Sequence, residues 1–252
     1  MSRKLKGLVV GAANAQSIAW GCAEAFHADG AELALTYLND KAKPYVAPLA
    51  EKTAAPIFMP LDVTDDAQME ALFATIREQW GQLDFVLHSI AFAPKADLLG
   101  RVTDCSRQGF ATAMDVSCHS FIRLARLAEP LMTEGGALLT MSYYGAEKVV
   151  TNYNLMGPVK AALEASVRYL ASELGPKHIR VNGLSPGPIK TRAASGLGDF
   201  DALMLKAAES APLHQLVTID QVGEAAAFLV SDRARQITGQ IIYIDNGYNV
   251  RG

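Results

Sequence analysis

The pattern that most constrains this fold is the alternation of short apolar runs with longer amphipathic stretches along the 252 residues. The short runs predict strands at 7–10, 32–37, 56–59, 85–88, 137–141, 180–184 and 240–244. The longer stretches predict helices at 17–29, 42–52, 66–80, 107–132, 154–174 and 219–230. Strands separated by helices indicate βαβ units and a parallel sheet. Because the strands lack polar alternation, we expect helices to cover both faces.

The predicted fold class is therefore α/β, a single-domain, doubly wound, Rossmann-like sheet that spans residues 1–252. Half of the residues are hydrophobic, which is enough for a large core. A net charge of −3 argues against a nucleic-acid partner. No apolar run approaches the roughly 20 residues of a membrane span, so we expect no membrane partner. Three scattered cysteines and five histidines predict no metal site and a reduced, cytoplasmic protein.

The first predicted strand ends in a turn of small residues that suits a pyrophosphate. Gly11 permits a tight turn, and the helix after the turn offers free N–H groups and a positive dipole end. Ser17 is placed to cap that helix or to bind a phosphate. The usual G-x-G-x-x-G is absent, so an ordinary strand–turn–helix with a serine cap fits this segment equally well.

Acidic residues follow the second and third predicted strands. Asp40 lies where such folds meet the adenosine ribose, and an acid there favours NADH over NADPH. Asp62 is placed to accept a hydrogen bond from the amino group of adenine. The alternatives are that Asn39 and Asp40 cap the next helix, and that Asp62 caps the helix after it.

The sharpest chemical signal is the spacing of Tyr153 and Lys160. If this segment is helical, seven residues are almost two turns, and both side chains project from one face. A positive charge near a tyrosine hydroxyl favours its ionisation. Tyr144 and Lys148 form a second tyrosine–lysine pair, but they follow a predicted strand too closely to lie on a long helix, so we reject them.

Together these motifs resemble the divergent short-chain dehydrogenase/reductases, and within them the bacterial NADH-dependent enoyl-[acyl-carrier-protein] reductases. Most of that superfamily carries Tyr-x3-Lys, whereas these reductases carry Tyr-x6-Lys, as Tyr153 and Lys160 do. They also open with Gly-x5-Ser-x-Ala, as Gly11, Ser17 and Ala19 do. Further similar stretches lie at 88–94, 142–143, 187–191, 193–196 and 237–239. The resemblance covers residues 5–248, almost the whole chain.

The resemblance implies reduction of the trans-2 double bond of enoyl thioesters in type II fatty acid elongation, with NADH as cofactor. It implies that Tyr153 stabilises the enolate, Lys160 holds the nicotinamide ribose, and Tyr143 lies beside the acyl chain. The cofactor-binding residues that it implies are Gly11, Ser17, Ile18, Leu38, Asp62, Val63, Ile90, Lys160, Ile189, Lys190, Thr191, Arg192 and Ala193. The substrate-binding residues that it implies are Ala93, Tyr143, Tyr153, Met156 and Phe200.

One position departs from the family. A glutamine often stands where this chain has Leu38, and leucine cannot hydrogen-bond a ribose. The affinity for the cofactor, or the preference among cofactors, is therefore expected to differ here.

The resemblance also implies a mobile substrate-binding loop at about residues 191–213, and acyl carrier protein as the partner that delivers the substrate. It implies a homotetramer in which the helices predicted over 107–132 and 154–174 pack across a two-fold axis. An amphipathic helix packed on the core is the alternative for the loop. Helices that pack only on their own sheet are the alternative for the tetramer.

Two other functions stay open. A 3-oxoacyl or carbonyl reductase on the same fold is disfavoured by the Tyr-x6-Lys spacing. A catalytically silent dinucleotide-binding protein is disfavoured by the presence of Tyr153, Lys160 and Ser17.

Overall fold

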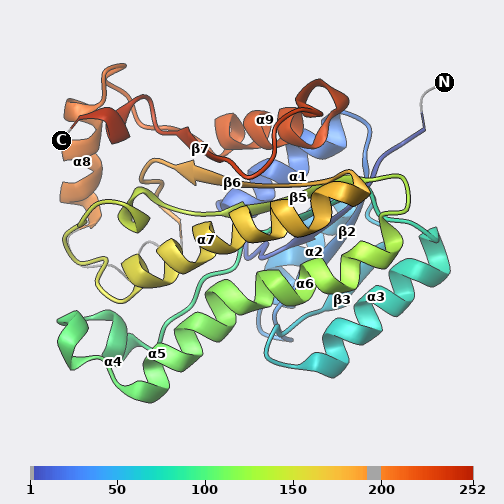
Figure 1. Ribbon diagram of the computed structural model, residues 1–252, viewed down its shortest axis with the longest axis horizontal. Helices are drawn as coiled ribbons and strands as arrows, with labels where there is room; N and C mark the ends of the chain where they lie inside the picture. Colours follow the sequence, from blue (N-terminus) through green and yellow to red (C-terminus); the bar gives the residue numbers. More distant parts are fainter. Residues whose placement is uncertain (1–2, 192–199, 252) are drawn as a thin grey trace.

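The computed structural model describes residues 3–191 and 200–251, which form one seven-stranded sheet with the order β3-β2-β1-β4-β5-β6-β7 (Figure 1). All neighbouring strands are parallel, as the sequence predicts. The strands are β1 (Lys6–Val10), β2 (Glu32–Tyr37), β3 (Ile57–Pro60), β4 (Phe85–His88), β5 (Gly136–Met141), β6 (Ile179–Pro186) and β7 (Ile241–Ile244). Each predicted strand lies within two residues of its expected ends.

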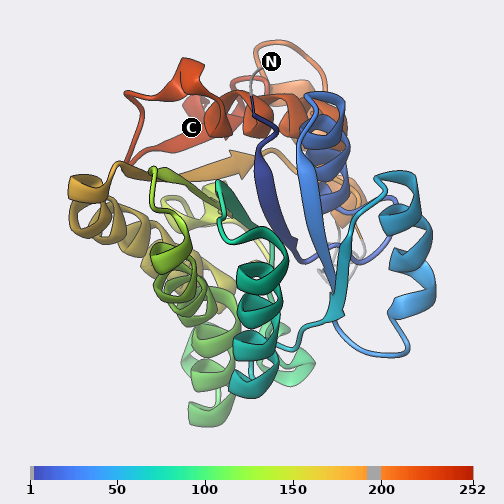
Figure 2. The same ribbon diagram turned by 90° about the vertical axis from the view of Figure 1, so that its right-hand side faces the viewer.

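Helices cover both faces of the sheet and enclose a separate apolar cluster on each (Figures 1 and 2). The cluster on one face is formed with α3 (Asp66–Trp80), α6 (Ser120–Ala128) and α7 (Met156–Leu174). The cluster on the other face is formed with α1 (Ile18–Ala28), α2 (Lys43–Lys52) and α9 (Ile219–Val230). This arrangement confirms the predicted doubly wound sheet and explains why the strands are apolar throughout.

The prediction of one regular helix over residues 107–132 is wrong. It comprises α5 (Arg107–Met114), a π-helical turn (Asp115–His119), α6 and a closing 3₁₀ turn (Glu129–Leu131). In the wide turn, the Ser117 hydroxyl leaves the helix to bind the backbone of Phe92. In the next turn, the Ser120 hydroxyl donates to the Val116 carbonyl at 2.7 Å. Such side-chain competition for backbone groups bends helices, and periodicity alone does not reveal it.

Two α-helices lie outside the six predicted helical stretches. Helix α4 (Lys95–Leu98) follows β4, and α8 (Phe200–Ser210) lies within the stretch predicted as a substrate-binding loop. Residues 200–210 are therefore helical, as the alternative for this stretch expected, but α8 belongs to neither apolar cluster; residues 192–199 lie outside the described residues. In the parts of the chain that the structure describes, no helix has the length and apolar character needed to cross a bilayer.

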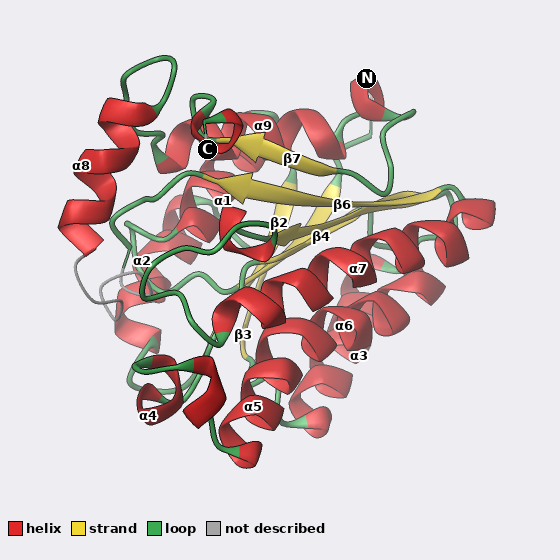
Figure 3. Ribbon diagram, turned by 60° about the vertical axis from the view of Figure 1, so that its left-hand side comes forward, coloured by secondary structure: helices red, strands yellow, loops and turns green. Residues whose placement is uncertain are grey.

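The carboxyl ends of the strands meet at one edge of the sheet. In Figure 3 the arrowheads of β6 and β7 point toward the side of the molecule where α4 and α8 lie. In parallel α/β sheets, ligands bind at this edge, where the strand order reverses. The reversal falls between β1 and β4.

Candidate active site

The predicted site residues follow different strands but gather at this one edge. Gly11 follows β1, Leu38 follows β2, Asp62 and Val63 follow β3, Ile90 and Ala93 follow β4, Tyr143 follows β5, and Ile189, Lys190 and Thr191 follow β6. Arg192 and Ala193 lie outside the described residues, as does the side chain of Phe200. Loops that lie far apart in sequence thus line a single site.

The turn after β1 packs closely against the residues that follow β4. Gly11 has a φ of +102°, and a Cβ atom there would lie 2.1 Å from the Ser89 carbonyl oxygen. Ser17 does not cap α1 as the alternative reading expected. Its hydroxyl instead donates to the Asn14 carbonyl at 2.7 Å and accepts from Ala13 N–H at 3.4 Å. The N–H groups at the start of α1, near Ile18, therefore have no side-chain cap, and they suit a phosphate.

The loops after β2 and β3 show whether Asn39, Asp40 and Asp62 cap the helices that follow. The Asn39 side chain accepts a hydrogen bond from Ala42 N–H at 3.1 Å, but α2 (Lys43–Lys52) has no side-chain cap, so the capping alternative is not supported. Asp40 and Leu38 are exposed. Asp65, rather than Asp62, caps α3. Asp62 Oδ1 accepts hydrogen bonds from Thr64 N–H at 2.9 Å and from its hydroxyl at 2.7 Å.

The helical placement of Tyr153 is wrong. Tyr153 lies in a turn before α7, between Asn152 and Asn154, which have φ values of +64° and +44°. Asparagine adopts this left-handed conformation more readily than most residues, so the chain turns here before the helix begins. The ring of Tyr153 nevertheless meets the ring of Tyr143 edge to face, with centroids 4.8 Å apart.

Burial sets the protonation of both tyrosines. It raises the pKa of Tyr153 and of Tyr143 well above the ordinary value. Lys160 is not among the groups that shift the pKa of Tyr153, so the expected ionisation of this hydroxyl is not supported. The buried Tyr143 hydroxyl has no hydrogen-bond partner among the described residues. Two neutral phenols at this edge can donate hydrogen bonds to a substrate oxygen.

Lys160 projects from the first turns of α7 into the protein and is 4% exposed. Its ammonium donates a hydrogen bond to the Met141 carbonyl at 2.6 Å. Burial lowers the pKa of Lys160 to about 8, and the carboxylate of Glu164 acts in the opposite direction. Because a shifted pKa of this kind needs a specific environment, the lysine is a candidate functional group. Lys148, in contrast, is exposed in a loop, which agrees with its rejection.

Glu164 is a site residue that the sequence analysis missed. It lies one turn after Lys160 on α7, is 5% exposed, and accepts a hydrogen bond from the Ser142 hydroxyl at 2.5 Å. Burial raises the pKa of Glu164. Lys160 and Glu164 thus bind consecutive residues at the end of β5, directly before Tyr143. The spacing of four residues on a predicted helix was the signal available in the sequence.

His88 is the second residue that the sequence analysis missed. It ends β4, is fully buried, and hydrogen-bonds the Thr140 hydroxyl at 2.9 Å and the Ser120 hydroxyl at 2.8 Å. Burial, aided by the charge of Lys160, lowers the pKa of His88 to about 3. The imidazole is neutral near pH 7 and joins β4 to β5 and α6.

The remaining predicted residues are buried or partly buried in or beside the two apolar clusters. Ala93 and Met156 are 9% and 6% exposed, and both belong to the apolar cluster on the α7 face. Ile90 and Ile189 are partly buried beside the two clusters. Groups of three or more side chains able to hold a metal ion are absent from the described part of the chain.

Two features test whether these residues fit a dinucleotide. The start of α1 has no side-chain cap, and the buried Tyr143 hydroxyl has no hydrogen-bond partner among the described residues. Both lie at the carboxyl edge of the sheet, and the strand order reverses between β1 and β4. The residues therefore fit NAD(H).

Comparison with known proteins agrees with this geometry. A family model described as enoyl-(acyl carrier protein) reductase matches residues 11–249. The chain is 49% identical over 247 residues to enoyl-[acyl-carrier-protein] reductase (NADH) 1 of Rhizobium meliloti, covering 98% of this chain and 91% of the relative. It is also 49% identical over 247 residues to the FabI enoyl-[acyl-carrier-protein] reductase (NADH) of Synechocystis sp., covering 97% and 96%.

A solved structure extends the likeness to three dimensions. The enoyl-(acyl-carrier-protein) reductase of Anaplasma phagocytophilum, in complex with NAD, superposes with a TM-score of 0.95 at 50% identity. The superposition covers 98% of this chain and 95% of that one.

Proposed function

The chain belongs to the enoyl-(acyl carrier protein) reductase family, and we propose that it uses NADH to reduce the trans-2 double bond of enoyl thioesters. The observation that carries this function is that Tyr143, in ring contact with Tyr153, closely follows the end of β5 that Lys160 binds. Acyl carrier protein is the partner that presents the thioester, in keeping with the names of the relatives.

The cofactor would be held along the sheet edge. Gly11, Ser17 and Ile18 would lie against the pyrophosphate, Leu38 near the adenosine ribose, and Asp62 with Val63 at the adenine. Ile90 and the Ile189–Ala193 segment, including Lys190, Thr191 and Arg192, would line the nicotinamide, and Lys160 would hold its ribose. When bound, NADH supplies the hydride for the β-carbon of the substrate.

Tyr153 stabilises the charge that develops on the thioester oxygen. As hydride arrives at the β-carbon, an enolate forms on that oxygen, and a preorganised donor there lowers the barrier. Burial raises the pKa of Tyr153, so its hydroxyl keeps the proton that it donates in the hydrogen bond. Tyr143 contacts Tyr153 through its ring. It would bound the acyl chain together with Ala93 and Met156.

The α7 helix positions this pair. Lys160 and Glu164 bind Met141 and Ser142, which fixes the end of β5 and the tyrosine directly after it. Gly145 permits the ring of Tyr153 to approach, since a Cβ atom there would lie 2.4 Å from Tyr153 Cδ1.

The assembly and the cellular setting are further parts of this proposal. Exposed aromatic side chains lie on two helices that the family resemblance places at subunit contacts: Phe110 on α5, 45% exposed, and Tyr169 on α7, 73% exposed. They support a homotetramer. The three free cysteines, Cys22, Cys105 and Cys118, support a reducing, cytoplasmic setting. Helix α8 and the residues up to 213 would cover the acyl chain, whereas residues 192–199 of the predicted loop lie outside the described residues.

Oxidation of NADH by the purified protein tests the function. We expect turnover with a trans-2-enoyl thioester, much slower turnover with NADPH, and none with the matching 3-oxoacyl thioester. Reduction of the oxoacyl substrate would indicate a carbonyl reductase instead. Tight NADH binding without any turnover would indicate a silent dinucleotide-binding protein.

A further inference from the structure

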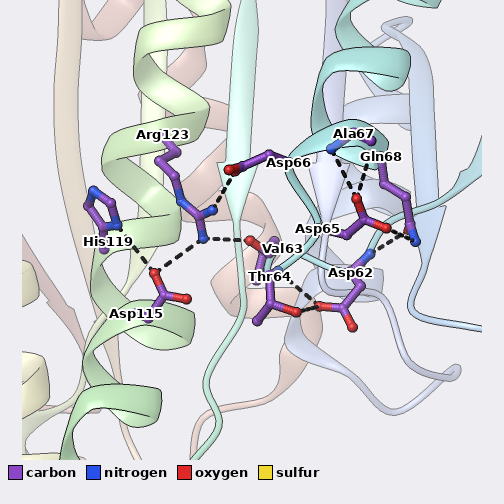
Figure 4. A network of polar contacts seen from close by, with 10 residues as sticks. All are labelled: Asp62, Val63, Thr64, Asp65, Asp66, Ala67, Gln68, Asp115, His119 and Arg123. Carbon is purple, nitrogen blue, oxygen red and sulfur yellow. Dashed lines mark hydrogen bonds and ion pairs between the residues drawn. The ribbon is translucent and has the colours of Figure 1, made fainter.

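A single arginine of α6 anchors the loop after β3 (Figure 4). Arg123 Nη1 donates to Asp66 Oδ1 at 2.8 Å, and Nη2 donates to the Val63 carbonyl oxygen at 2.5 Å. Nη2 also lies 3.4 Å from Asp115 Oδ1 in the π-helical turn. Only 18% of the arginine side chain is exposed, whereas that of Asp66 is 78% exposed. Arg123 is therefore fixed between two segments rather than free on the surface.

Helix α3 holds the same loop from the other side (Figure 4). Asp62 N–H donates to Gln68 Oε1 at 2.9 Å, and Gln68 Nε2 donates to Asp65 Oδ2 at 3.0 Å. The hydrogen bonds from Thr64 use Asp62 Oδ1 alone. None of the hydrogen bonds found within residues 3–191 and 200–251 uses Asp62 Oδ2, which leaves this oxygen for a ligand.

Arg123 also places a positive charge among several carboxylates. The segment 62–66 contains three carboxylates, Asp62, Asp65 and Asp66, and Asp115 faces it from the π-helical turn. Carboxylates this close repel one another unless a cation lies between them. The forked guanidinium can bond a carbonyl and a carboxylate together, which an ammonium on a flexible stem cannot do as well.

We propose that Arg123 is a positioning residue that sets the base preference of the dinucleotide site. It holds the Val63 carbonyl, and the loop then presents the Asp62 carboxylate to the exocyclic amino group of adenine. This inference rests on the proposed function, because that function places adenine at Asp62. A carboxylate accepts a hydrogen bond from this amino group but not from the carbonyl that hypoxanthine carries in its place.

Binding of NADH and of its hypoxanthine analogue, measured by nucleotide fluorescence, tests the proposal. The wild type should prefer NADH by roughly tenfold or more, as expected for one hydrogen bond to an ionised acceptor. Arg123→Met should weaken NADH binding roughly tenfold and analogue binding less than about twofold, so that the preference approaches one. Arg123→Lys should recover part of the preference, since it keeps the charge but not the fork.

Two control variants separate positioning from general damage. Asp66→Asn removes the exposed ion pair but keeps the contact with Val63, so the base preference should stay as in the wild type. Arg3→Met removes a bidentate pair with Asp84, at 2.7 and 3.1 Å, near the amino ends of the strands, and should leave both affinities unchanged.

Either of two results would overturn the proposal. One is an equal loss of both nucleotides in Arg123→Met, which is the pattern of a merely structural residue. The other is a wild type that does not distinguish the two bases. Because binding is measured without an acyl substrate, absence of enoyl reduction would reject the proposed function and leave this measurement valid. Conversely, a wild type without base preference would reject the role of Arg123 but would not count against the reductase reaction.

Discussion

The two halves of the site differ in how they are built. The adenine half, after β2 and β3, presents polar groups at or near the surface: Asp40 and Thr64 are exposed, and Asp62 is half-buried. The nicotinamide half, after β4 and β5, contains buried ionisable groups: His88, Lys160 and Glu164 are 0%, 4% and 5% exposed. Burial shifts the pKa of each of these three groups.

This difference separates recognition from chemistry. Polar groups near water bind and orient a ligand at little cost to folding. Ionisable groups removed from water acquire the protonation states that a reaction needs, and the packed core bears the cost of burying them. We therefore expect changes in the nicotinamide half to alter turnover or its pH dependence, and changes in the adenine half to alter affinity alone.

The largest expected effect comes from removing the donor to the enolate. Tyr153→Phe should lower kcat by about 10²- to 10³-fold, the usual loss for one donor to a developing oxyanion. The affinity for NADH should change little, because the tyrosine faces the substrate. Steady-state kinetics with an enoyl thioester and a separate NADH titration measure the two effects. Tyr144→Phe removes a nearby hydroxyl outside the site and serves as the matched control. An equal loss in both variants would contradict the assigned role.

A smaller effect, but one that depends on pH, is expected at Lys160. Its ammonium is charged below a pKa of about 8 in the free protein. Binding of the anionic dinucleotide favours the charged form and raises that pKa, so the affinity is fully present below pH 8 and falls as pH rises above it. Lys160→Gln should weaken NADH binding by roughly 10- to 100-fold near pH 7 and should remove this pH dependence.

NADH titrations between pH 6.5 and 9.5 check this expectation. Lys148→Gln, which removes an exposed lysine from a nearby loop, should keep both the affinity and the pH dependence of the wild type. If Lys160→Gln retains a decline of affinity above pH 8, then another group causes it, and the role given to Lys160 is wrong.

The smallest effect is expected at Leu38 in the adenine half. Leu38→Gln introduces a hydrogen-bonding group beside the expected ribose and should tighten NADH binding by roughly 2- to 10-fold, with kcat unchanged. Leu38→Ala removes the same apolar side chain without adding a donor and should not tighten binding. A change in kcat in either variant would contradict the expectation that changes in the adenine half alter affinity alone.

The sequence predicted the sheet well because both faces of the sheet are covered. Strands such as β4 are buried along their whole length, so their apolar runs are unbroken and easy to find. The candidate site residues after each strand were predicted from a resemblance carried by local motifs. Tyr153 was placed wrongly because left-handed turns at Asn152 and Asn154 delay the start of α7.

Other parts of the site depend on contacts between segments that lie far apart in the chain. Arg123 meets Val63 across 60 residues, and His88 meets Thr140 across 52. The periodicity of either segment alone contains no sign of such a contact. The sequence did allow Glu164 to be found, since it lies one helical turn from Lys160, but its partner Ser142 lies 22 residues earlier, directly after β5.

The π-helical turn between α5 and α6 acts as a rotational offset. Each residue added to an α-helix rotates the remainder of the helix by about 100° around the axis. The wide turn takes up one additional residue, so the helix before it and the helix after it present different faces to the sheet edge. Ser117 and Ser120 thereby reach the strand end at β4, while Arg123 reaches the loop after β3. An unbroken α-helix of the same length would rotate Arg123 by about 100° away from Val63, separating the two ends of the site that this helix now holds in register.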